Sequence, residues 1–303
     1  MNDSSVGCRW WKMVALDDVG SFARRSKSRV VFCTALVLGF SLALASRNQA
    51  AEEPTAPLPL VRAHAHNDYE HKRPLLDALE QGFCSVEADV WLIDGELRVA
   101  HDLEDARPGR TLQKLYLEPL RARVQQNGGR VFRDGPAIIL MIDVKSDATN
   151  TYRVLREVLQ GYESMLTRFT PNQTVTNAVT VVISGNRTLD WMRREPARLA
   201  AYDGRLADLE QGPATTPHLI PLISDNWTQH FQWRAQPADG PMPEEERAKL
   251  RKLVQRAHRQ GRLLRLWGTP EQQAAWRELK EAGVDLINTD DLAGLARYLR
   301  EHP

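Results

Sequence analysis

Short apolar runs of strand type alternate with segments of helical periodicity from residue 58 to the end of the chain. A run of four to eight apolar residues bounded by turn residues is typical of a buried strand. The sequence predicts eight such strands, at 58–65, 84–92, 137–144, 179–184, 199–202, 219–224, 262–267 and 286–288. A ninth strand, 96–100, should pair back against the second across the Asp94-Gly95 turn.

Helices are expected after most of these strands. The predicted segments are 74–81, 111–127, 151–166, 186–194, 243–260, 292–300 and one helix capped by Thr269 with Pro270 at its first position. The clearest is 243–260, which has three glutamates in its first turn, an apolar stripe at helical spacing and Gly261 after its last residue. Eight alternating strand–helix units in about 245 residues predict an α/β fold, a (β/α)₈ TIM barrel over 58–303.

The first 57 residues do not fit this pattern. Basic residues at 24, 25, 27 and 29 precede the apolar run 30–45, which is shorter than the ~20 residues of a spanning helix. The small residues of Ala43-Leu44-Ala45 suit a cleavage site, so we expect a signal peptide at 1–45 and a linker at 46–57. The mature protein should be exported, periplasmic or secreted, with no stable membrane span. An uncleaved anchor is the alternative.

Composition narrows the function only modestly. The 303 residues include 40 basic and 39 acidic side chains, a balance that gives no reason to expect nucleic acid as a partner. Cys8 and Cys33 lie in the leader, which leaves Cys84 alone in the mature chain. An intramolecular disulfide is therefore excluded in the exported protein, and the core must hold the fold.

Carboxylates occupy alternate positions at the ends of two predicted strands. Glu87 and Asp89 share one face of the second strand, and Asp143 and Lys145 repeat this spacing at the end of the third. In a barrel the carboxyl ends of the strands meet on one face, where catalytic groups lie. Three carboxylates suit a hard cation, Mg²⁺ or Ca²⁺, and the lysine suits an anionic ligand such as phosphate.

Histidines complete this candidate site. His64 and His66 share a face at the end of the first strand, and His101 follows the strand that pairs back. Two imidazoles beside a metal-bound phosphodiester suit general acid and general base catalysis near neutral pH. Trp267, at the end of the seventh strand, would either form an apolar wall for the leaving group or pack in the core. The histidines at 71, 218, 230, 258 and 302 have no predicted role.

These motifs resemble a known superfamily. His64, Glu87-Ala88-Asp89 and His101-Asp102 are similar to the signature of the glycerophosphodiester phosphodiesterases and phosphatidylinositol phospholipase C-like barrels. The string from His64 to Tyr69 is closer to the fungal altered-inheritance-of-mitochondria protein family and its bacterial secreted relatives, and the resemblance covers about residues 60–298. It implies a divalent cation held by Glu87, Asp89 and Asp143, and a histidine pair acting on a small-molecule or lipid phosphodiester.

We expect Lys145, Trp267 and Asn67 to bind the substrate. The glycerophosphodiesterases usually carry His-Arg-Gly where this chain has His64-Ala65-His66, and a glutamate at the position of Asp143. The Asp-x-Lys version resembles the venom sphingomyelinase/phospholipase D branch. The glycerophosphodiesterase alignment favours His64 as the catalytic residue and the phospholipase C alignment favours His66; we expect His64.

Two other classes of protein remain open on the sequence. His-x-His at the end of a first barrel strand is also found in zinc amidohydrolases, which need further histidines at the ends of the fifth and sixth strands. The third class is a catalytically quiet barrel that binds ligands or cations without turnover.

Overall fold

The computed structural model describes residues 57–210 and 215–303. The predicted signal peptide, and the linker except for its last residue, lie outside the described residues, so the leader stays a prediction. Within the described ranges no helix is both long enough and apolar enough to cross a membrane.

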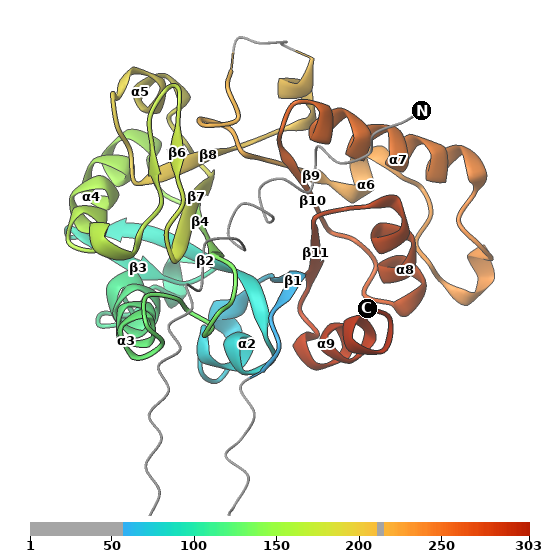
Figure 1. Ribbon diagram of the computed structural model, residues 1–303, viewed down its shortest axis with the longest axis horizontal. Helices are drawn as coiled ribbons and strands as arrows, with labels where there is room; N and C mark the ends of the chain where they lie inside the picture. The colour runs from blue at the N-terminus through green and yellow to red at the C-terminus, as the bar shows by residue number, and fades with distance from the viewer. Residues whose placement is uncertain (1–56, 211–214) are drawn as a thin grey trace, which may run out of the picture.

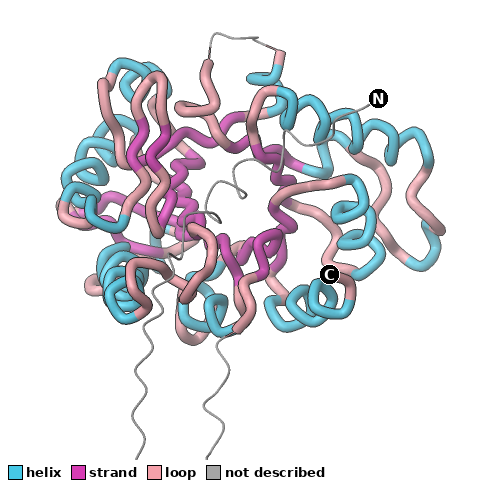
Figure 2. The backbone as a smooth tube through the Cα atoms, in the orientation of Figure 1, coloured by secondary structure: helices cyan, strands magenta, loops and turns pink. Residues whose placement is uncertain are grey.

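Parallel strands form a closed ring with helices outside it (Figures 1 and 2). The barrel closes because β1 pairs with both β2 and β11. In their order around the ring, the eight strands of the described chain are β1 (Leu60–Ala65), β2 (Phe83–Ile93), β4 (Ile138–Val144), β7 (Val179–Gly185), β8 (Ala200–Gly204), β9 (Leu222–Asn226), β10 (Leu263–Trp267) and β11 (Leu286–Thr289). The predicted (β/α)₈ barrel is confirmed.

The predicted return strand is also present. The strand β3 (Glu96–Val99) pairs antiparallel with the end of β2. Asp94 has φ 53° and Gly95 has φ 81°, the left-handed conformation that a two-residue hairpin turn requires at both central positions. The hairpin extends β2 beyond the barrel and carries the chain back to His101.

Helices surround the ring in the described part of the chain (Figure 1). Their bounds are α2 (Leu76–Glu80), α3 (Glu118–Gln126), α4 (Ala148–Gln160), α5 (Leu189–Arg194), α6 (Trp227–His230), α7 (Glu244–Arg259), α8 (Gln273–Ala282) and α9 (Leu292–Glu301). A π-helical turn, Gln113–Leu117, precedes α3. Acidic residues in the first turn of α7 and basic residues in its last turn complement the helix dipole.

Several predicted boundaries were wrong for local reasons. The helix expected at 151–166 begins at Ala148, because the Asp147 side chain accepts a hydrogen bond from the Asn150 N–H, and it ends at Gln160. Thr269 does not cap the next helix: α8 begins at Gln273, and the Thr269 hydroxyl has no hydrogen-bond partner among the described residues. A small hairpin, β5 (Arg168–Phe169) and β6 (Thr174–Val175), was not anticipated.

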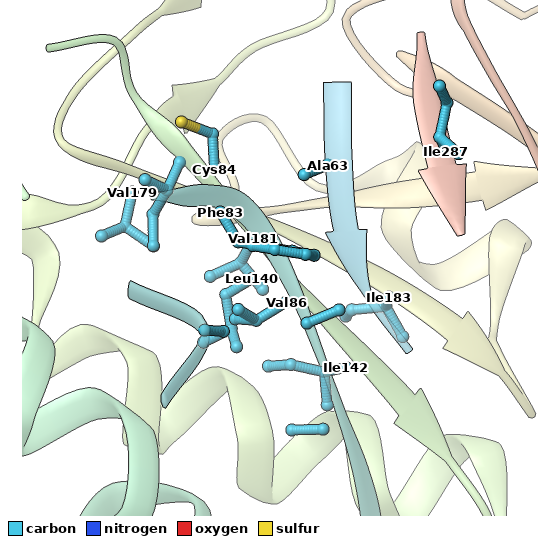
Figure 3. Packing of buried hydrophobic residues seen from close by; sticks show 14 of the residues in the cluster. Ala63, Phe83, Cys84, Val86, Leu140, Ile142, Val179, Val181, Ile183 and Ile287 are labelled. Atoms are coloured by element: carbon cyan, nitrogen blue, oxygen red, sulfur yellow. The ribbon is translucent and has the colours of Figure 1, made fainter. Parts of the chain in front are cut away.

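The alternation of side chains along the strands produces two hydrophobic layers. Val86, Leu140 and Val181 are cross-strand neighbours on the outer face of the sheet, within the large core that packs against the helices (Figure 3). A second, smaller cluster lies inside the ring. It comprises Phe169 of β5 and inward-facing residues of the barrel strands, Ile139, Met141, Val182, Ala201, Leu222 and Leu286. Polar side chains continue this inner face toward the carboxyl ends of the strands.

Candidate active site

Strand register brings the three predicted carboxylates together. In the pairing of β2 with β4, Asp89 lies opposite Asp143, and Glu87 lies opposite Met141, one inward-facing position lower. One oxygen of each of Glu87, Asp89 and Asp143 lies within 4.8 Å of the others. The spacing of two residues within each strand fixes the face, and the register between the strands fixes the cluster.

Negative charge in this cluster is only partly compensated. The Lys145 Nζ atom lies 3.0 Å from Asp89 Oδ2 and 3.1 Å from Asp143 Oδ1. Burial and the Glu87 carboxylate still raise the pKa of Asp89 to about 6 and also raise the pKa of Asp143. Asp89 Oδ1 is buried and has no hydrogen-bond partner among the described residues. A buried acceptor of this kind costs free energy until a ligand reaches it.

Arg265 is a member of the site that the sequence analysis missed. It lies on β10, is 2% exposed, and places its guanidinium 2.5 Å from Glu87 Oε2. Burial opposes ionisation of Glu87, but Arg265 and the hydrogen bond with His64 lower the pKa of Glu87 well below its usual range. A second bond, from Arg265 Nε to Asn288 Oδ1, fixes the orientation of the guanidinium. Glu87 is therefore ionised at neutral pH.

His64 is enclosed below the cluster. It is 0% exposed, with Nδ1 2.6 Å from Ser85 Oγ and Nε2 3.0 Å from Glu87 Oε2. Burial and the charge of Arg265 lower the pKa of His64 to about 3, so the ring is neutral. Because the ionised Glu87 only accepts, His64 Nε2–H donates to it and Nδ1 accepts from the Ser85 hydroxyl. Complete burial with both nitrogens occupied argues against the direct contact with a phosphate expected of His64.

His66 has the exposure that His64 lacks. Its side chain is 26% exposed, and Nδ1 lies 2.8 Å from Asp290 Oδ1. The carboxylate fixes the tautomer: Nδ1–H donates to Asp290, and Nε2 has no partner among the residues that the structure describes. Burial opposes protonation, but the Asp290 hydrogen bond and the charge of Glu87 together raise the pKa of His66. Asp290 follows β11, the strand that closes the barrel against β1.

His101 forms a second imidazole–carboxylate pair. Its side chain is 55% exposed, with Nδ1 3.1 Å from Asp89 Oδ2 and 3.2 Å from the Tyr69 hydroxyl. The same hydroxyl lies 2.8 Å from Asp89 Oδ2 and 2.6 Å from Asn67 Oδ1. Tyr69 is thus a further residue missed by the sequence analysis, and it connects His101 with the turn after β1.

Asn67 and Trp267, predicted to bind substrate, have protein partners. Asn67 has φ 47°, and its side chain lies between Tyr69 and Asp290, with Nδ2 3.4 Å from Asp290 Oδ1. It therefore joins the surroundings of the two exposed histidines. Trp267 is half-buried, and the Arg205 guanidinium lies 4.9 Å from its ring centroid. No hydrogen bond links Trp267 to the carboxylate cluster in the described residues.

The donor set fits a hard divalent cation. Glu87, Asp89 and Asp143 offer oxygen ligands alone, which suit Mg²⁺ or Ca²⁺. The unpartnered Asp89 Oδ1 and the raised pKa values of Asp89 and Asp143 are what a carboxylate site built for a cation is expected to show without it. A zinc site of the amidohydrolase kind is not supported, because the cluster of possible metal ligands found in the described ranges contains no histidine.

Most of the chain is similar to known proteins. Residues 54–203 match the AIM6-like phosphodiesterase domain, and residues 264–293 match the glycerophosphoryl diester phosphodiesterase family. The chain is 31% identical over 275 residues to altered inheritance of mitochondria protein 6 of Eremothecium gossypii, covering 79% of this chain and 69% of that protein. It is 29% identical over 269 residues to the homolog of that protein in Arthroderma benhamiae, covering 80% and 84%.

Among solved structures, a glycerophosphodiester phosphodiesterase from Parabacteroides distasonis aligns with a TM-score of 0.46 and 15% identity, covering 79% of this chain and 96% of that one. One from Agrobacterium tumefaciens gives a TM-score of 0.45 and 16% identity.

The closed barrel and the matched domain define a (β/α)₈ protein of the phosphodiesterase class. The chain belongs to the altered inheritance of mitochondria protein 6 family, as the identity to the Eremothecium protein shows. The resemblance seen in the sequence is thereby confirmed. The names of these fungal relatives state no activity.

Proposed function

We propose that this protein is an exported, cation-dependent phosphodiester hydrolase that acts on a glycerophosphodiester or a phospholipid-like substrate. The observation that carries the proposal is the pair of exposed imidazoles beside one acidic cluster. His66 and His101 each have Nδ1 bonded to a carboxylate, Asp290 and Asp89. Each ring therefore directs its chemistry through Nε2, as a general acid–base pair requires.

The residues divide the reaction between them. A divalent cation held by Glu87, Asp89 and Asp143 would supply charge neutralisation at a phosphate oxygen. Lys145 adds a positive charge beside the same carboxylates; although burial disfavours that charge, Asp143 and Asp89 raise the pKa of Lys145, which keeps it protonated. The Nε2 atom of one imidazole accepts the proton of the attacking water or substrate hydroxyl, and the oxygen of that nucleophile bonds to phosphorus. The other gives its Nε2 proton to the departing alcohol oxygen.

His64 takes a positioning role in this proposal. It holds Glu87 Oε2 from one side while Arg265 holds the same oxygen from another. The Glu87 carboxylate is thereby fixed in place before any ligand arrives, and its second oxygen is left for the cluster. The assignment of catalysis to His66 rather than His64 follows from exposure and from the free Nε2 atom.

Hydrolysis of bis-p-nitrophenyl phosphate tests the reaction class. The wild type should lose turnover in EDTA and regain it with Mg²⁺ or Ca²⁺. His66→Ala and His101→Ala should each lose about 10²–10⁴-fold in turnover, the range for a lost general acid or base. His302→Ala, an exposed histidine near the C-terminus, is the matched control and should match the wild type.

His64→Ala separates the two assignments. The variant should bind the cation more weakly yet regain much of its turnover at saturating cation, because a positioning residue acts through Glu87. Full activity of His66→Ala together with an inactive, folded His64→Ala would reverse the roles. Turnover unaffected by EDTA and by every histidine variant would rule out the cation dependence and the assigned histidines. Product analysis on a panel of glycerophosphodiesters and lysophospholipids then identifies the substrate.

Export has a separate test. The apolar run 30–45 and the Ala43-Leu44-Ala45 site support a mature N-terminus near Ser46. N-terminal sequencing of protein recovered from the periplasm or medium of an expressing bacterium should find it there. Full-length chain confined to the cytoplasm would contradict export while leaving the enzymatic proposal in place.

A further inference from the structure

A polar cleft opens beside the carboxylate cluster. Its volume is about 630 Å³, and it lies between the loop that follows β4 and the loop that follows β7, with Tyr202 of β8 at one side. Its lining includes Lys145, Ser146, Ala148, Gly185, Arg187 and Tyr202. We name it the Arg187 cleft. It shares Lys145 with the catalytic cluster, so a ligand bound there adjoins the proposed position of the phosphodiester.

The floor of the cleft touches the cluster directly. Gly185 has φ +66°, and a Cβ atom at this position would lie 2.4 Å from Asp143 Oδ1 and 2.5 Å from the Val144 carbonyl oxygen. A side chain is therefore excluded at Gly185 on both conformational and steric grounds. The backbone that follows is tied down, because Asn186 Nδ2 donates to the carbonyl oxygens of Lys145 and Ser146. The cleft is thus formed in advance of any ligand.

Arg187 supplies the positive charge of the cleft. Its guanidinium lies 4.8 Å from the Tyr202 ring centroid, and one terminal N–H group donates to the Gly185 carbonyl oxygen. Within the described residues Arg187 forms no ion pair, and its buried Nε atom has no hydrogen-bond partner. A guanidinium held over an aromatic ring, with donors left over, is pre-organised for a planar or tetrahedral anion.

The remaining charges of the cleft favour the same ligand. Ala148 is the first residue of the thirteen-residue helix α4, whose N-terminus carries positive partial charge, and Ser146 precedes its N-cap residue. Lys145 adds a second cation. Asp147 is the opposing charge; it is exposed, and one of its oxygens caps the helix by accepting from Asn150 N–H. The cleft thus has two cationic side chains, a helix N-terminus and one exposed carboxylate, Asp147. Lys145 also pairs with Asp89 and Asp143 of the cluster, so Arg187 is the cation of the cleft that has no carboxylate partner in the described residues.

We propose that the Arg187 cleft binds a second anionic group of the substrate, a phosphate monoester or a carboxylate carried by one of the alcohols of the scissile phosphodiester. This inference rests on the proposed phosphodiesterase function. It makes the preferred substrate a diester with an additional negative charge on one arm, in place of a neutral or purely cationic head group.

Two matched pairs of substrates test the cleft. The phosphate arm compares glycerophosphoglycerol with its terminal phosphate monoester, and the carboxylate arm compares glycerophosphoethanolamine with glycerophosphoserine. The wild type should show a lower KM for the anionic member of at least one pair. Arg187→Met should raise that KM by about tenfold to a hundredfold, the range for a lost charged hydrogen bond. The KM of the member that lacks the additional anionic group should change less than about twofold.

Controls separate binding from folding. Arg193→Met, on the exposed side of α5, removes an arginine outside the cleft and should leave both values unchanged. Ala148→Glu removes no contact of Arg187 and adds a negative charge in the cleft at a position that favours acidic residues; it should raise the KM of the anionic member alone. Arg187→Lys should retain part of the preference, because it keeps the charge but not the fork.

Two outcomes overturn the proposal: equal KM changes for both members of each pair in Arg187→Met and Ala148→Glu, or no change in either variant. If the wild type hydrolyses none of the four compounds, bis-p-nitrophenyl phosphate decides the proposed function, and calorimetric affinities for the four compounds decide the cleft. Binding of an anionic member at least about tenfold tighter than its partner, lost in Arg187→Met, supports the cleft without turnover. Equal affinities would overturn it.

Discussion

Two buried carboxylates inside the barrel, Asp203 and Asp89, differ in how completely their oxygens are hydrogen-bonded. On β8, Asp203 is 0% exposed and accepts from Ser184 Oγ at 2.8 Å, from Ser224 Oγ at 2.6 Å and from Arg205 at 2.8 Å. On β2, Asp89 is 1% exposed, and its Oδ1 atom has no partner in the described chain. The first carboxylate has its bonds supplied by the fold, and the second does not.

This difference separates support from function. The partners of Asp203 come from β7, β9 and the end of β8, so the carboxylate ties three strands together. Asp89 instead lies beside two further carboxylates, which repel it and raise its pKa to about 6. A fold tolerates an arrangement that costs free energy at a site where a bound ligand compensates for that cost. Asp203 therefore stabilises the fold, whereas we assign Asp89 to binding of the cation.

The largest expected effect is on turnover, from Asp89→Asn. Loss of one charge from a three-carboxylate site should reduce phosphodiester turnover by about 10³-fold or more, because several kcal/mol of charge stabilisation depend on the cation. The folded-state pKa of Asp89 lies above its usual value, so its ionised form weakens the metal-free fold at neutral pH. Urea unfolding in EDTA should find the variant at least as stable as the wild type. Near-normal turnover with an unchanged response to cations would break the comparison.

Asp203→Ala should give the opposite pattern. It leaves Arg205 and two serine hydroxyls without their acceptor, a loss of about 3 kcal/mol in the free energy of unfolding. Denaturant unfolding measures it, with Ser224→Ala as the smaller matched change of about 1 kcal/mol. The folded fraction of Asp203→Ala should still bind Mg²⁺ or Ca²⁺ as the wild type does. A variant that is stable but no longer binds cations would place Asp203 in the site.

Sequence periodicity predicted which side chains share a face of their strand. The two-residue spacing of Glu87 and Asp89, and the apolar run before Asp143, were sufficient to direct the three carboxylates into one barrel end. The same spacing could not give depth. His64 and His66 share a face, but one lies below the cluster with both nitrogens bonded and the other lies at the opening.

The residues that the sequence analysis missed depend on closure of the ring. Arg265 reaches Glu87 across a separation of 178 residues, and Asp290 reaches His66 across 224. In the sequence, Arg265 is one charge within an apolar strand, with no local signal of its partner. Asn186 and Arg187 were expected in a helix, but side-chain bonds to the loop after β4 delay the start of α5 to Leu189. Local propensity does not contain these contacts.

A third buried carboxylate, Asp68, sharpens the comparison through pH. Its Oδ2 atom accepts from Leu75 N–H at 2.5 Å and from the Tyr116 hydroxyl at 2.9 Å, whereas Oδ1 has no partner among the described residues. Burial raises the pKa of Asp68 to about 6 despite these bonds. Between about pH 4 and pH 6 this carboxyl group therefore binds more protons in the folded protein than in the unfolded chain, and its contribution to the free energy of unfolding falls as the pH rises.

Asp68→Asn should remove up to one proton from that dependence, about 1.4 kcal/mol per pH unit at most within the window. Urea unfolding in EDTA at a series of pH values from 4 to 7.5 measures the slope, with exposed Asp105→Asn as the control. An unchanged slope in Asp68→Asn would show that this carboxylate is already ionised at low pH.

The most direct test of the account is the effect of cation on stability. In metal-free wild type, Mg²⁺ or Ca²⁺ at about 100 times its dissociation constant should raise the free energy of unfolding by about 2.7 kcal/mol, because the cation binds the folded cluster. Asp89→Asn should gain none of this, whereas Asp68→Asn, outside the cluster, should gain it in full. A wild type that gains no stability from either cation, or an Asp89→Asn variant that gains as much as the wild type, would contradict the assignment of the unsatisfied carboxylates to a cation site.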